Sequence, residues 1–576
     1  MRTIFSHVRL DKKKIVGLII FMLVSSVAEM MLPTMLANMI DNGVSAGNRS
    51  HIFTIAIVMA VMAVLACIAT VVATRLSAKV STKFAADVRE VVFHKVQEFS
   101  SAEMDKFGTA SLVTRSTSDV ANIQQFLTLL LRMGILAPLM AVAGLVLSAA
   151  SGGKVSSVLN VAIPVLIVSS GLIIILVARY SVKLRTRIDQ INKLFLETLE
   201  GVRVIRAFNK QQHEIDRFED TNKEYAKIAT TSGRFSGLIM PVIQVIFGVS
   251  TAAVMGLGSY YVSEGQMEVG ALVANSQYIS MILGAVIMFA VVIMMFPTAY
   301  ACAKRIAEVL NTETSIKDGK LDLSARTSES TVEFRNVTFA YPGADEPVLR
   351  DITFESHPGE ITAIIGRTGC GKSSILKLIP RLYDPTVGHI LIDGMDVKDL
   401  PVDDVRSLIG YVPQKNVLFS GDIASNLNFG NENGDEADWK EAAGIACASE
   451  FVDKKEGTYH SEIAQGGTNL SGGQRQRLAI ARAIMKKPEI YLFDDSFSAL
   501  DMKTDKQLRT NLKESMGGAT VIMVAQRVSS IIDADRILVI ENGMIVGNGT
   551  HSELLKSCPL YREIAALQLG EEAVAQ

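Results

Sequence analysis

The chain has 576 residues, of which 49% are hydrophobic, and its mean hydropathy is positive. These values are high for a fully soluble protein, and the length allows a large membrane domain followed by one soluble domain. Five cysteines are scattered along the chain without a CxxC pair, which excludes a disulfide scaffold and a cysteine-based zinc site. The formal net charge of −2 gives no indication of a nucleic-acid partner.

Six long apolar stretches occur in the first 300 residues. Each reaches the length of about 20 residues that a helix needs to cross a bilayer core of about 30 Å. The predicted membrane spans are residues 15–40, 52–74, 127–150, 155–178, 235–262 and 269–300.

The connections between these spans alternate in length and charge. Short connections occur at Asp41–Ser50, Ser151–Lys154 and Ser263–Val269, whereas Arg75–Arg115 and Arg179–Arg234 are long and rich in Arg and Lys. Because basic loops stay in the cytoplasm, both long loops and both termini are predicted to be cytoplasmic. Apolar residues recur every three or four positions in the long loops, so we expect helices that continue the spans.

After about residue 310 the sequence changes character. Residues 311–330 are polar without a clear period and are predicted to be a linker. From Thr331 onward, short apolar runs alternate with helical patterns, which is typical of an α/β domain. The segment ILVIENGMIVG is predicted to be a hairpin that turns on Asn542-Gly543.

A phosphate-binding motif follows one of the predicted strands. The run Gly366-Arg367-Thr368-Gly369-Cys370-Gly371-Lys372-Ser373 matches GxxxxGK[ST] between the strand ITAII and a helix. Its glycines let consecutive backbone N–H groups converge on phosphates. Lys372 would supply a positive charge to the β and γ phosphates, and Ser373 a ligand for Mg²⁺.

Two further motifs complete the pattern. The apolar strand Ile490–Phe493 ends at Asp494, a carboxylate suited to holding Mg²⁺. Between the two motifs lies Leu470-Ser471-Gly472-Gly473-Gln474. With LSGGQ between these motifs and six spans ahead of them, the chain resembles an ABC exporter half-transporter. The resemblance implies an all-α six-span transmembrane domain with long cytoplasmic helical loops (1–310), a linker (311–330) and an α/β P-loop ATP-binding cassette domain (331–576).

The resemblance also assigns roles to individual residues. Tyr341 matches the aromatic residue that stacks on adenine, and Gln414 matches the Q-loop glutamine. In this family two cassettes pair head to tail, so the LSGGQ residues of one chain contact the ATP held by its partner. Short helices near Ala102–Phe107 and Gly201–Phe208 match the family's coupling helices. ATP and Mg²⁺ are the expected cofactors, with Mg²⁺ near Ser373, Gln414 and Asp494. The expected nucleotide contacts are Tyr341, Gly366, Thr368, Gly369, Cys370, Gly371, Lys372, Ser373, Ser374, Gln414, Ser471, Gly472, Gly473, Gln474 and Asp501.

The sequence departs from the family pattern at two catalytic positions. Asp495 stands where the general base is normally glutamate, and Gln526 stands where the switch residue is normally histidine. An aspartate carboxylate falls short of a glutamate carboxylate by about one C–C bond, or about 1.5 Å. Glutamine can donate a hydrogen bond but cannot carry a proton. A site altered at both positions is expected to bind ATP well and to hydrolyse it slowly; the alternative is that both substitutions are tolerated.

This combination resembles one subunit of the heterodimeric bacterial multidrug exporters. It implies an ATP-hydrolysing translocase in the bacterial cell membrane, multi-pass, with its N-terminus and cassette in the cytoplasm. Its expected partners are a second half-transporter, the lipid bilayer and a hydrophobic small molecule, with no nucleic acid. The alternatives are a homodimeric exporter of lipids or peptides and a nucleotide-sensing regulatory subunit.

One acidic residue lies within the first predicted span. Glu29 interrupts the apolar segment VAEMMLPTML, and an ionisable residue at that depth faces a cavity or a partner by default. We expect Glu29 to line the substrate path and to favour cationic compounds. The alternative is a structural hydrogen bond to a neighbouring helix, with Arg132 or a backbone carbonyl as partner.

Overall fold

The computed structural model describes residues 2–152, 155, 157–326 and 330–570. Residues 153–154 of the predicted outer turn, 327–329 of the predicted linker and 571–576 of the predicted cassette lie outside the described residues. The chain forms two compact units. The first contains Met1–Lys95 and Ala110–Thr312, and the second contains Val96–Thr109 and Glu313–Gln576.

The first unit is entirely helical. Six of its helical stretches are long and apolar enough to cross a membrane, as the sequence predicts. Its elements are α1 Arg2–His7, α2 Lys12–Asn38, the π-helical turn η1 Met39–Val44, α3 Arg49–Gln97, α5 Thr109–Ser116, α6 Ser118–Gly152, α7 Ser157–Glu200, α8 Val202–Ala207, α9 Gln211–Ser263 and α10 Val269–Asn311.

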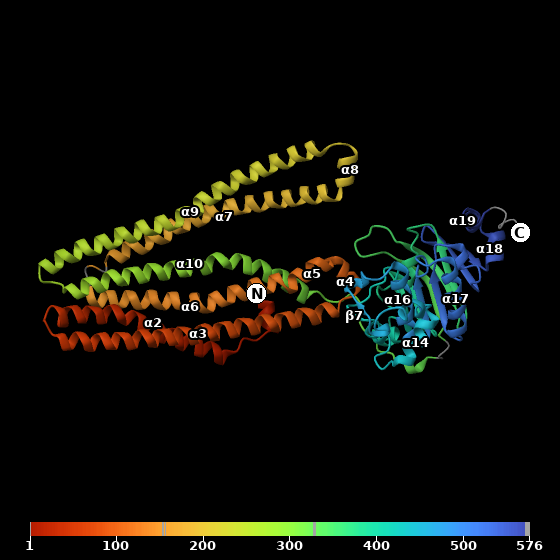
Figure 1. The fold of residues 1–576 in the computed structure, drawn as a ribbon, viewed down its shortest axis with the longest axis horizontal. Coiled ribbons are helices and arrows are strands. Elements are labelled where there is room, and N and C mark those ends of the chain that lie inside the picture. The colour runs from red at the N-terminus through yellow and green to blue at the C-terminus, as the bar shows by residue number, and fades with distance from the viewer. Residues whose placement is uncertain (1, 153–154, 156, 327–329, 571–576) are drawn as a thin grey trace. The chain divides into compact units, whose positions relative to one another are not determined.

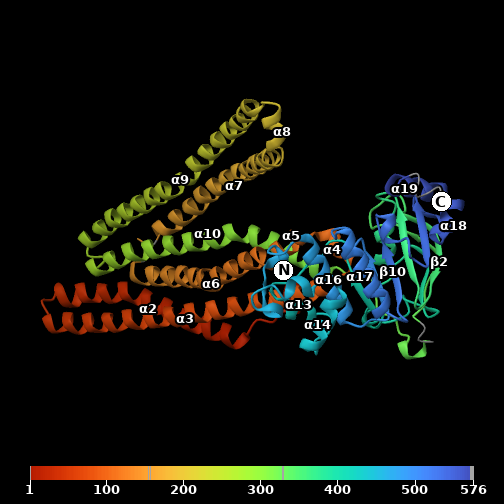
Figure 2. The same cartoon turned by 45° about the vertical axis from the view of Figure 1, so that its right-hand side comes forward.

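The long helices of this unit pack in pairs. Helix α10 lies along α6, and α7 lies along α9 (Figure 1). The prediction that the spans continue beyond their apolar stretches is confirmed, because α3 runs without interruption into the first long loop as far as Gln97, and α7 and α9 together cover most of the second. Helix α8 joins the ends of α7 and α9 at the tip of that pair (Figure 2).

Burial in the first unit follows the membrane expectation. Tyr278, Ile279 and Ile282 of α10 are fully buried against neighbouring helices. Many other large apolar side chains are exposed, among them Phe53 of α3 and Val168 of α7. Exposed apolar side chains are expected on a helix that contacts lipid. The backbone N–H and C=O groups of such a helix are already hydrogen-bonded within the helix.

The second unit is an α/β domain. Its six-stranded sheet has the order β12-β11-β3-β10-β9-β6, a four-stranded sheet has the order β2-β1-β4-β5, and β7 pairs with β8. The strands are β1 Val332–Phe339, β2 Leu349–Ser356, β3 Ile361–Gly366, β4 Val387–Ile392, β5 Met395–Asp396, β6 Ile409–Val412, β7 Gly421–Asp422, β8 Glu462–Ile463, β9 Ile490–Asp494, β10 Thr520–Val524, β11 Arg536–Glu541 and β12 Met544–Gly549.

Helices cover these sheets. The helices are α4 Ser101–Phe107, α11 Lys372–Leu378, α12 Val402–Ser407, α13 Ile423–Asn428, α14 Glu436–Ile445, α15 Ser449–Val452, α16 Gly472–Met485, α17 Met502–Ser515, α18 His551–Ser557 and α19 Pro559–Leu569, with short 3₁₀ turns η2 Leu323–Ala325, η3 Thr458–His460, η4 Gln465–Gly467 and η5 Val528–Ser530. Helix α4 groups with this unit although it lies between α3 and α5 along the chain.

The direction of the strands positions the candidate site. Strands β3, β10, β9 and β6 are parallel, so their carboxyl ends meet at one edge of the sheet. The predicted hairpin is confirmed, because β11 and β12 pair antiparallel around Asn542 and Gly543. Both turn residues have positive φ, of 49° and 79°, as a two-residue type I′ turn requires.

Candidate nucleotide-binding site

Two positions in the loop between β3 and α11 require glycine. A Cβ on Gly366 would lie 2.2 Å from the carbonyl oxygen of Ile540 on the neighbouring strand β11. Gly371 has φ +98° and directly precedes the first residue of α11. These constraints keep the loop close to the sheet and direct its backbone toward one point in front of α11.

Lys372 closes this loop. Its Nζ donates hydrogen bonds to the carbonyl oxygens of Gly366 and Arg367, each at 2.9 Å. The thiol of the buried Cys370 lies 3.8 Å from the same ammonium group. The positive charge therefore lies over the phosphate-binding loop, where it can bind the β and γ phosphates of a nucleotide.

A carboxylate and a hydroxyl meet beside the loop. Asp494, at the end of β9, is 2% exposed, and the hydroxyl of Ser373 donates to its Oδ1 at 2.7 Å. Burial raises the pKa of Asp494, although the hydrogen bond from Ser373 acts to lower it. Gln414 lines the same cavity. The carboxylate of Asp494 and the hydroxyl of Ser373 fit Mg²⁺, which binds one or two carboxylates together with phosphates and water.

Asp495 is the next residue and is held differently. Its Oδ2 accepts hydrogen bonds from Nε2 of Gln526 at 2.7 Å and from Nε2 of Gln414 at 3.3 Å. Its backbone has φ +50°, a conformation that is uncommon for a residue other than glycine. Burial raises the pKa of Asp495, and the hydrogen bond from Gln414 opposes this effect. Two side-chain amides therefore bind Oδ2 of Asp495, the residue at the position where the family pattern has its general base.

These side chains surround a single cavity of about 360 Å³. Strand ends explain their convergence, because Gln414 follows β6, Asp494 ends β9 and Gln526 follows β10. The hydroxyl of Tyr341 lies 2.9 Å from that of Ser374 at the same cavity. The cavity is lined by Tyr341, Val348, Thr368, Gly369, Gly371, Lys372, Ser373, Ser374, Gln414, Asp494, Asp495, Val524 and Gln526.

Two lining residues were not predicted. Val348 precedes β2 and Val524 ends β10, and both are apolar. In the sequence, an apolar residue at a strand end cannot be distinguished from an apolar residue of the core, so the sequence offers no basis for choosing Val348 and Val524.

Seven predicted contacts are not among the described residues that line this cavity. Gly366 and Cys370 belong to the phosphate-binding loop itself, and the other five lie around the starts of α16 and α17. Ser471 caps the first turn of α16, where its hydroxyl accepts a hydrogen bond from the backbone N–H of Gln474 at 3.3 Å. Ser471 and Gly472 are exposed, Gly473 is partly exposed, and Asp501 is exposed at the start of α17. None of these five residues is among the described residues that line the cavity.

Glu29 lies in the other unit, on α2, and is half-buried. Its Oε1 accepts a hydrogen bond from the hydroxyl of Ser25 at 3.2 Å, and that hydroxyl lies 2.6 Å from the hydroxyl of Thr70 on α3. Arg132 is exposed on α6 and makes no hydrogen bond or ion pair with Glu29 among the described residues. Both the structural and the substrate-path hypotheses for Glu29 stay open.

Comparison with known proteins identifies two family regions in the chain. The ABC transporter transmembrane region matches residues 15–286, and the ABC transporter region matches residues 349–498. The chain is 38% identical over 568 residues to an uncharacterized ABC transporter ATP-binding protein of Mycobacterium tuberculosis, covering 98% of this chain and 97% of that protein.

Other similar proteins carry more specific names. A multidrug resistance ABC transporter ATP-binding and permease protein of Lactococcus lactis is 29% identical, covering 95% of this chain and 92% of that protein. An ATP-dependent lipid A-core flippase of Pseudomonas syringae is 30% identical, covering 86% and 82%. The solved structure of a bacterial Atm1-family ABC exporter with ATP bound matches with a TM-score of 0.80 and 26% identity, covering 96% of this chain and 98% of that one.

Proposed function

The chain belongs to the ABC transporter family as an exporter half-transporter, and from this we propose that it is the low-activity subunit of a heterodimeric multidrug exporter. Residues 1–310 would form the transmembrane domain, 311–330 the linker and 331–576 the cytoplasmic cassette. The chain would bind MgATP at its own loop and contribute its LSGGQ segment to the active site of the partner. The enzymatic activity is that of an ATP-hydrolysing translocase in the bacterial cell membrane.

The observation that carries this proposal is the pairing of Gln526 with Asp495. General-base catalysis requires a carboxylate oxygen that can accept a proton from water. Here one of the two carboxylate oxygens of Asp495, Oδ2, accepts two amide hydrogen bonds, at 2.7 and 3.3 Å, and the side chain is one methylene shorter than glutamate. Neither Gln526 nor Gln414 can accept the proton in its place. Loss of general-base catalysis costs about 10²–10⁴ in rate, so slow hydrolysis follows.

Two features support assembly with a second chain. The LSGGQ segment begins α16 with Ser471 and Gly472 exposed, apart from the cavity that holds Lys372. Helix α8 has no buried residue, and Val204 and the adjacent Phe208 are 60% and 72% exposed. Exposed apolar side chains of this kind mark a surface for contact with other protein, and we propose that the partner chain supplies that contact.

The residues of the site divide the work of nucleotide binding. Lys372 and the loop backbone hold the phosphates, and Tyr341 supports the base. Bound Mg²⁺, held by Ser373, Asp494 and Gln414, would neutralise phosphate charge. Because Asp495 is tied to the two glutamines, ATP at this site stays bound through many cycles and stabilises the closed dimer. Hydrolysis takes place at the partner's site and is linked to this one by binding free energy.

The names of two relatives suggest two classes of transported molecule. Similarity to the multidrug resistance transporter of Lactococcus lactis favours hydrophobic drugs. Similarity to the lipid A-core flippase of Pseudomonas syringae favours the second candidate, a homodimeric lipid exporter. A gene beside this one for a second half-transporter, with glutamate and histidine at the two catalytic positions and a damaged LSGGQ, would distinguish the heterodimer from the homodimer. Co-purification with that second chain would confirm the pairing.

The direct test is ATP hydrolysis by the purified chain alone in lipid, at a concentration that allows dimerisation. We expect ATP binding with near-zero turnover. Brisk turnover that Lys372→Ala abolishes would show that Asp495 and Gln526 suffice, and would overturn the heterodimer proposal.

A further inference from the structure

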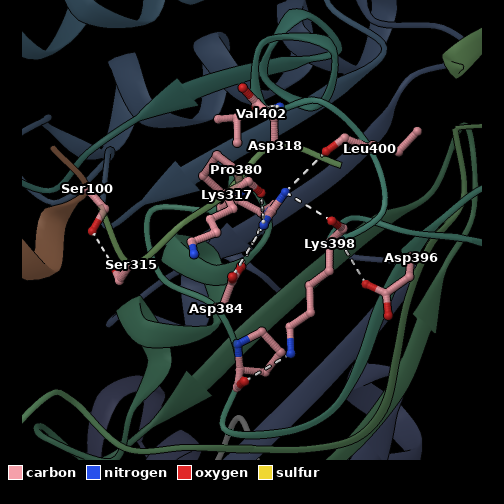
Figure 3. Close-up of polar contacts among 12 residues, drawn as sticks. Ser100, Ser315, Lys317, Asp318, Pro380, Asp384, Asp396, Lys398, Leu400 and Val402 are labelled. Carbon is pink, nitrogen blue, oxygen red and sulfur yellow. Dashed lines mark hydrogen bonds and ion pairs between the residues drawn. The ribbon is translucent and has the colours of Figure 1, made fainter. Parts of the chain in front are cut away.

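The turn that follows α11 contains a buried arginine with several partners. Arg381 is 2% exposed and has φ +49°. Its Nε donates to Oδ1 of Asp384 at 3.0 Å, its Nη1 donates to the carbonyl oxygen of Leu400 at 3.2 Å, and its Nη2 donates to that of Lys317 at 3.1 Å. Figure 3 shows Lys317, Asp384 and Leu400 converging on this point from three separate segments. One buried guanidinium therefore joins the linker to the end of α11.

The linker itself is docked on the cassette. Gly319 donates its backbone N–H to Leu400 at 3.1 Å, and Leu321 donates to Asp399 at 2.9 Å. The side chain of Asp318 accepts from the backbone N–H of Val402 at 3.0 Å (Figure 3). A Cβ on Gly319 would lie 1.9 Å from the carbonyl carbon of Asp399. Residues 317–321 thus follow the 399–402 segment as closely as a paired strand does, so this part of the linker is not a free tether.

The start of the linker is tied to α4. The backbone N–H of Ser315 donates to Oε1 of Glu103 at 3.1 Å, and the hydroxyls of Ser315 and Ser100 lie 3.0 Å apart. The backbone N–H of Ser100 donates to Oε2 of the same carboxylate at 3.0 Å, and Glu103 is 7% exposed. Ser315 is four residues beyond the end of α10, and Ser100 is three residues beyond the end of α3. One carboxylate therefore joins the segments that leave two membrane helices.

The other end of α4 is tied to the nucleotide site. The hydroxyl of Tyr383 donates to Oδ2 of Asp105 on α4. The ring of Tyr383, 5% exposed, meets the ring of Tyr341 edge-on with centroids 5.2 Å apart. Tyr341 lines the cavity of Lys372 and is the residue predicted to stack on adenine. The side chain of Tyr383 thus connects α4 to Tyr341, the residue predicted to hold the adenine base.

Arg381 and Tyr383 belong to the same short turn, Pro380–Asp384. We propose that this turn couples nucleotide occupancy to the membrane domain, with Arg381 and Tyr383 as positioning residues that hold the linker and α4 respectively. The inference rests on the proposed binding of ATP to this chain. It does not depend on which partner or cargo the exporter has.

The physical basis is mutual ordering. An adenine stacked on Tyr341 restricts the motion of that ring and of Tyr383 packed against it. Forming the hydrogen bond from Tyr383 to Asp105 then costs less conformational entropy, so ATP and docked α4 stabilise each other. By linkage, α4 must raise the affinity for ATP by the same factor by which ATP raises the stability of docked α4.

The test is amide hydrogen exchange of the full chain in lipid nanodiscs, with and without saturating MgATP, beside the measured affinity for ATP. In the wild type we expect ATP to slow exchange in residues 96–109 by about fivefold, the lower end of typical coupling. Tyr383→Phe should abolish this slowing and weaken ATP binding by the same factor. Tyr491→Phe is the matched control, since it removes the hydroxyl of another buried tyrosine, on β9, and should change neither quantity.

The linker arm uses two variants because Arg381 is fully buried. Arg381→Lys keeps the charge but donates from one nitrogen atom instead of the three that reach Asp384 and the carbonyls of Leu400 and Lys317, so ATP should no longer slow exchange in residues 313–321. Ser315→Ala removes the hydroxyl that contacts Ser100 and helps to lower the pKa of Glu103, and it leaves the backbone bond to Glu103 in place. We expect it to reduce the same response by about half while the fold is preserved. A linker response in Ser315→Ala equal to that of the wild type would overturn this part of the inference.

The outcomes separate the two proposals. A wild-type chain that does not bind ATP contradicts the proposed function. A chain that binds ATP without any slowing in residues 96–109, or with equal slowing in Tyr383→Phe, contradicts the coupling inference alone.

Discussion

The amide Nε2 of Gln526 lies 2.7 Å from Oδ2 of Asp495. These are the two residues at which the chain departs from the family pattern, and they contact each other directly. The two side chains are complementary, because the amide of Gln526 can donate a hydrogen bond and an ionised aspartate can only accept one. We therefore expect them to act as a unit, so that exchanging one alone leaves its partner badly placed.

This pairing predicts the outcome of restoring the family residues. Asp495→Glu alone should raise ATP turnover by less than about tenfold, because Gln526 still binds the carboxylate. Asp495→Glu combined with Gln526→His should raise turnover by about 10² or more, the typical contribution of a general base. Steady-state ATP hydrolysis in lipid measures both, with the same pair in a Lys372→Ala background as the inactive control. Equal rates for the single and double variants would contradict the pairing.

Much of this site could be predicted from the sequence because its chemistry lies in local motifs. The residues from Gly366 to Ser373 form one continuous motif, and the carboxylates Asp494 and Asp495 are adjacent at the end of β9. The strands that precede the two motifs are strongly apolar. The bond between Gln526 and Asp495 could not be predicted, since it depends on the register between β10 and β9. Strands β2 and β4 to β8 were not predicted. For three of them the reason is length, because β5, β7 and β8 have only two residues each, too few to show a period.

The linker is a second feature whose structure could not be predicted from the sequence. Its polar composition without a period predicted a linker, and a glycine such as Gly319 in a polar segment is commonly a sign of flexibility. In the structure Gly319 instead allows close backbone approach to Asp399. Sequence reasoning cannot tell these two uses of glycine apart, because both need only the absence of a side chain.

The hydroxyls of Ser373 and Ser374 should have separable roles. Ser373→Ala removes the hydroxyl that donates to Asp494 and that would be a ligand of Mg²⁺, so Mg²⁺ should no longer tighten ATP binding. Ser374→Ala removes the contact with Tyr341 and should weaken binding by about two- to fivefold while its dependence on Mg²⁺ remains. Titration of a fluorescent ATP analogue with and without Mg²⁺ distinguishes the two. The same Mg²⁺ dependence in both variants would argue against Ser373 as a ligand.

Glu29 offers a test of the substrate path. If it faces cationic cargo, Glu29→Gln should slow transport of a cationic dye by about tenfold and leave a neutral dye unaffected. Ser25→Ala is the matched control, because it removes the hydrogen bond to Glu29 without changing charge. A purely structural role predicts similar losses for both variants and both dyes. Dye efflux from proteoliposomes that contain the assembled exporter provides the measurement.

Gly319→Ala should destabilise the cassette. Its Cβ would meet the backbone of Asp399 at 1.9 Å, and overpacking of this kind costs about 1–3 kcal/mol when the backbone must shift. Gly517→Ala is a suitable control, since nothing lies within 4 Å of a Cβ at that position. Thermal unfolding of the full chain should show a lower midpoint for Gly319→Ala alone. A linker that is only a tether would tolerate both changes equally.

The junction at Glu103 should weaken in acid. Burial by itself would raise the pKa of this carboxyl, but hydrogen bonds from Ser100 and Ser315 outweigh burial and hold the pKa below its ordinary value of 4.5. A lowered folded-state pKa means that the carboxylate contributes stability above pH 4.5, and that this contribution is lost as the pH falls through the lower, folded-state value. The unfolding midpoint of the wild type should therefore exceed that of Glu103→Gln at pH 7, and the difference should shrink as the pH falls below 4.5. Because the amide of glutamine does not titrate, a difference that stays constant with pH would mean that Glu103 acts through packing rather than through its charge.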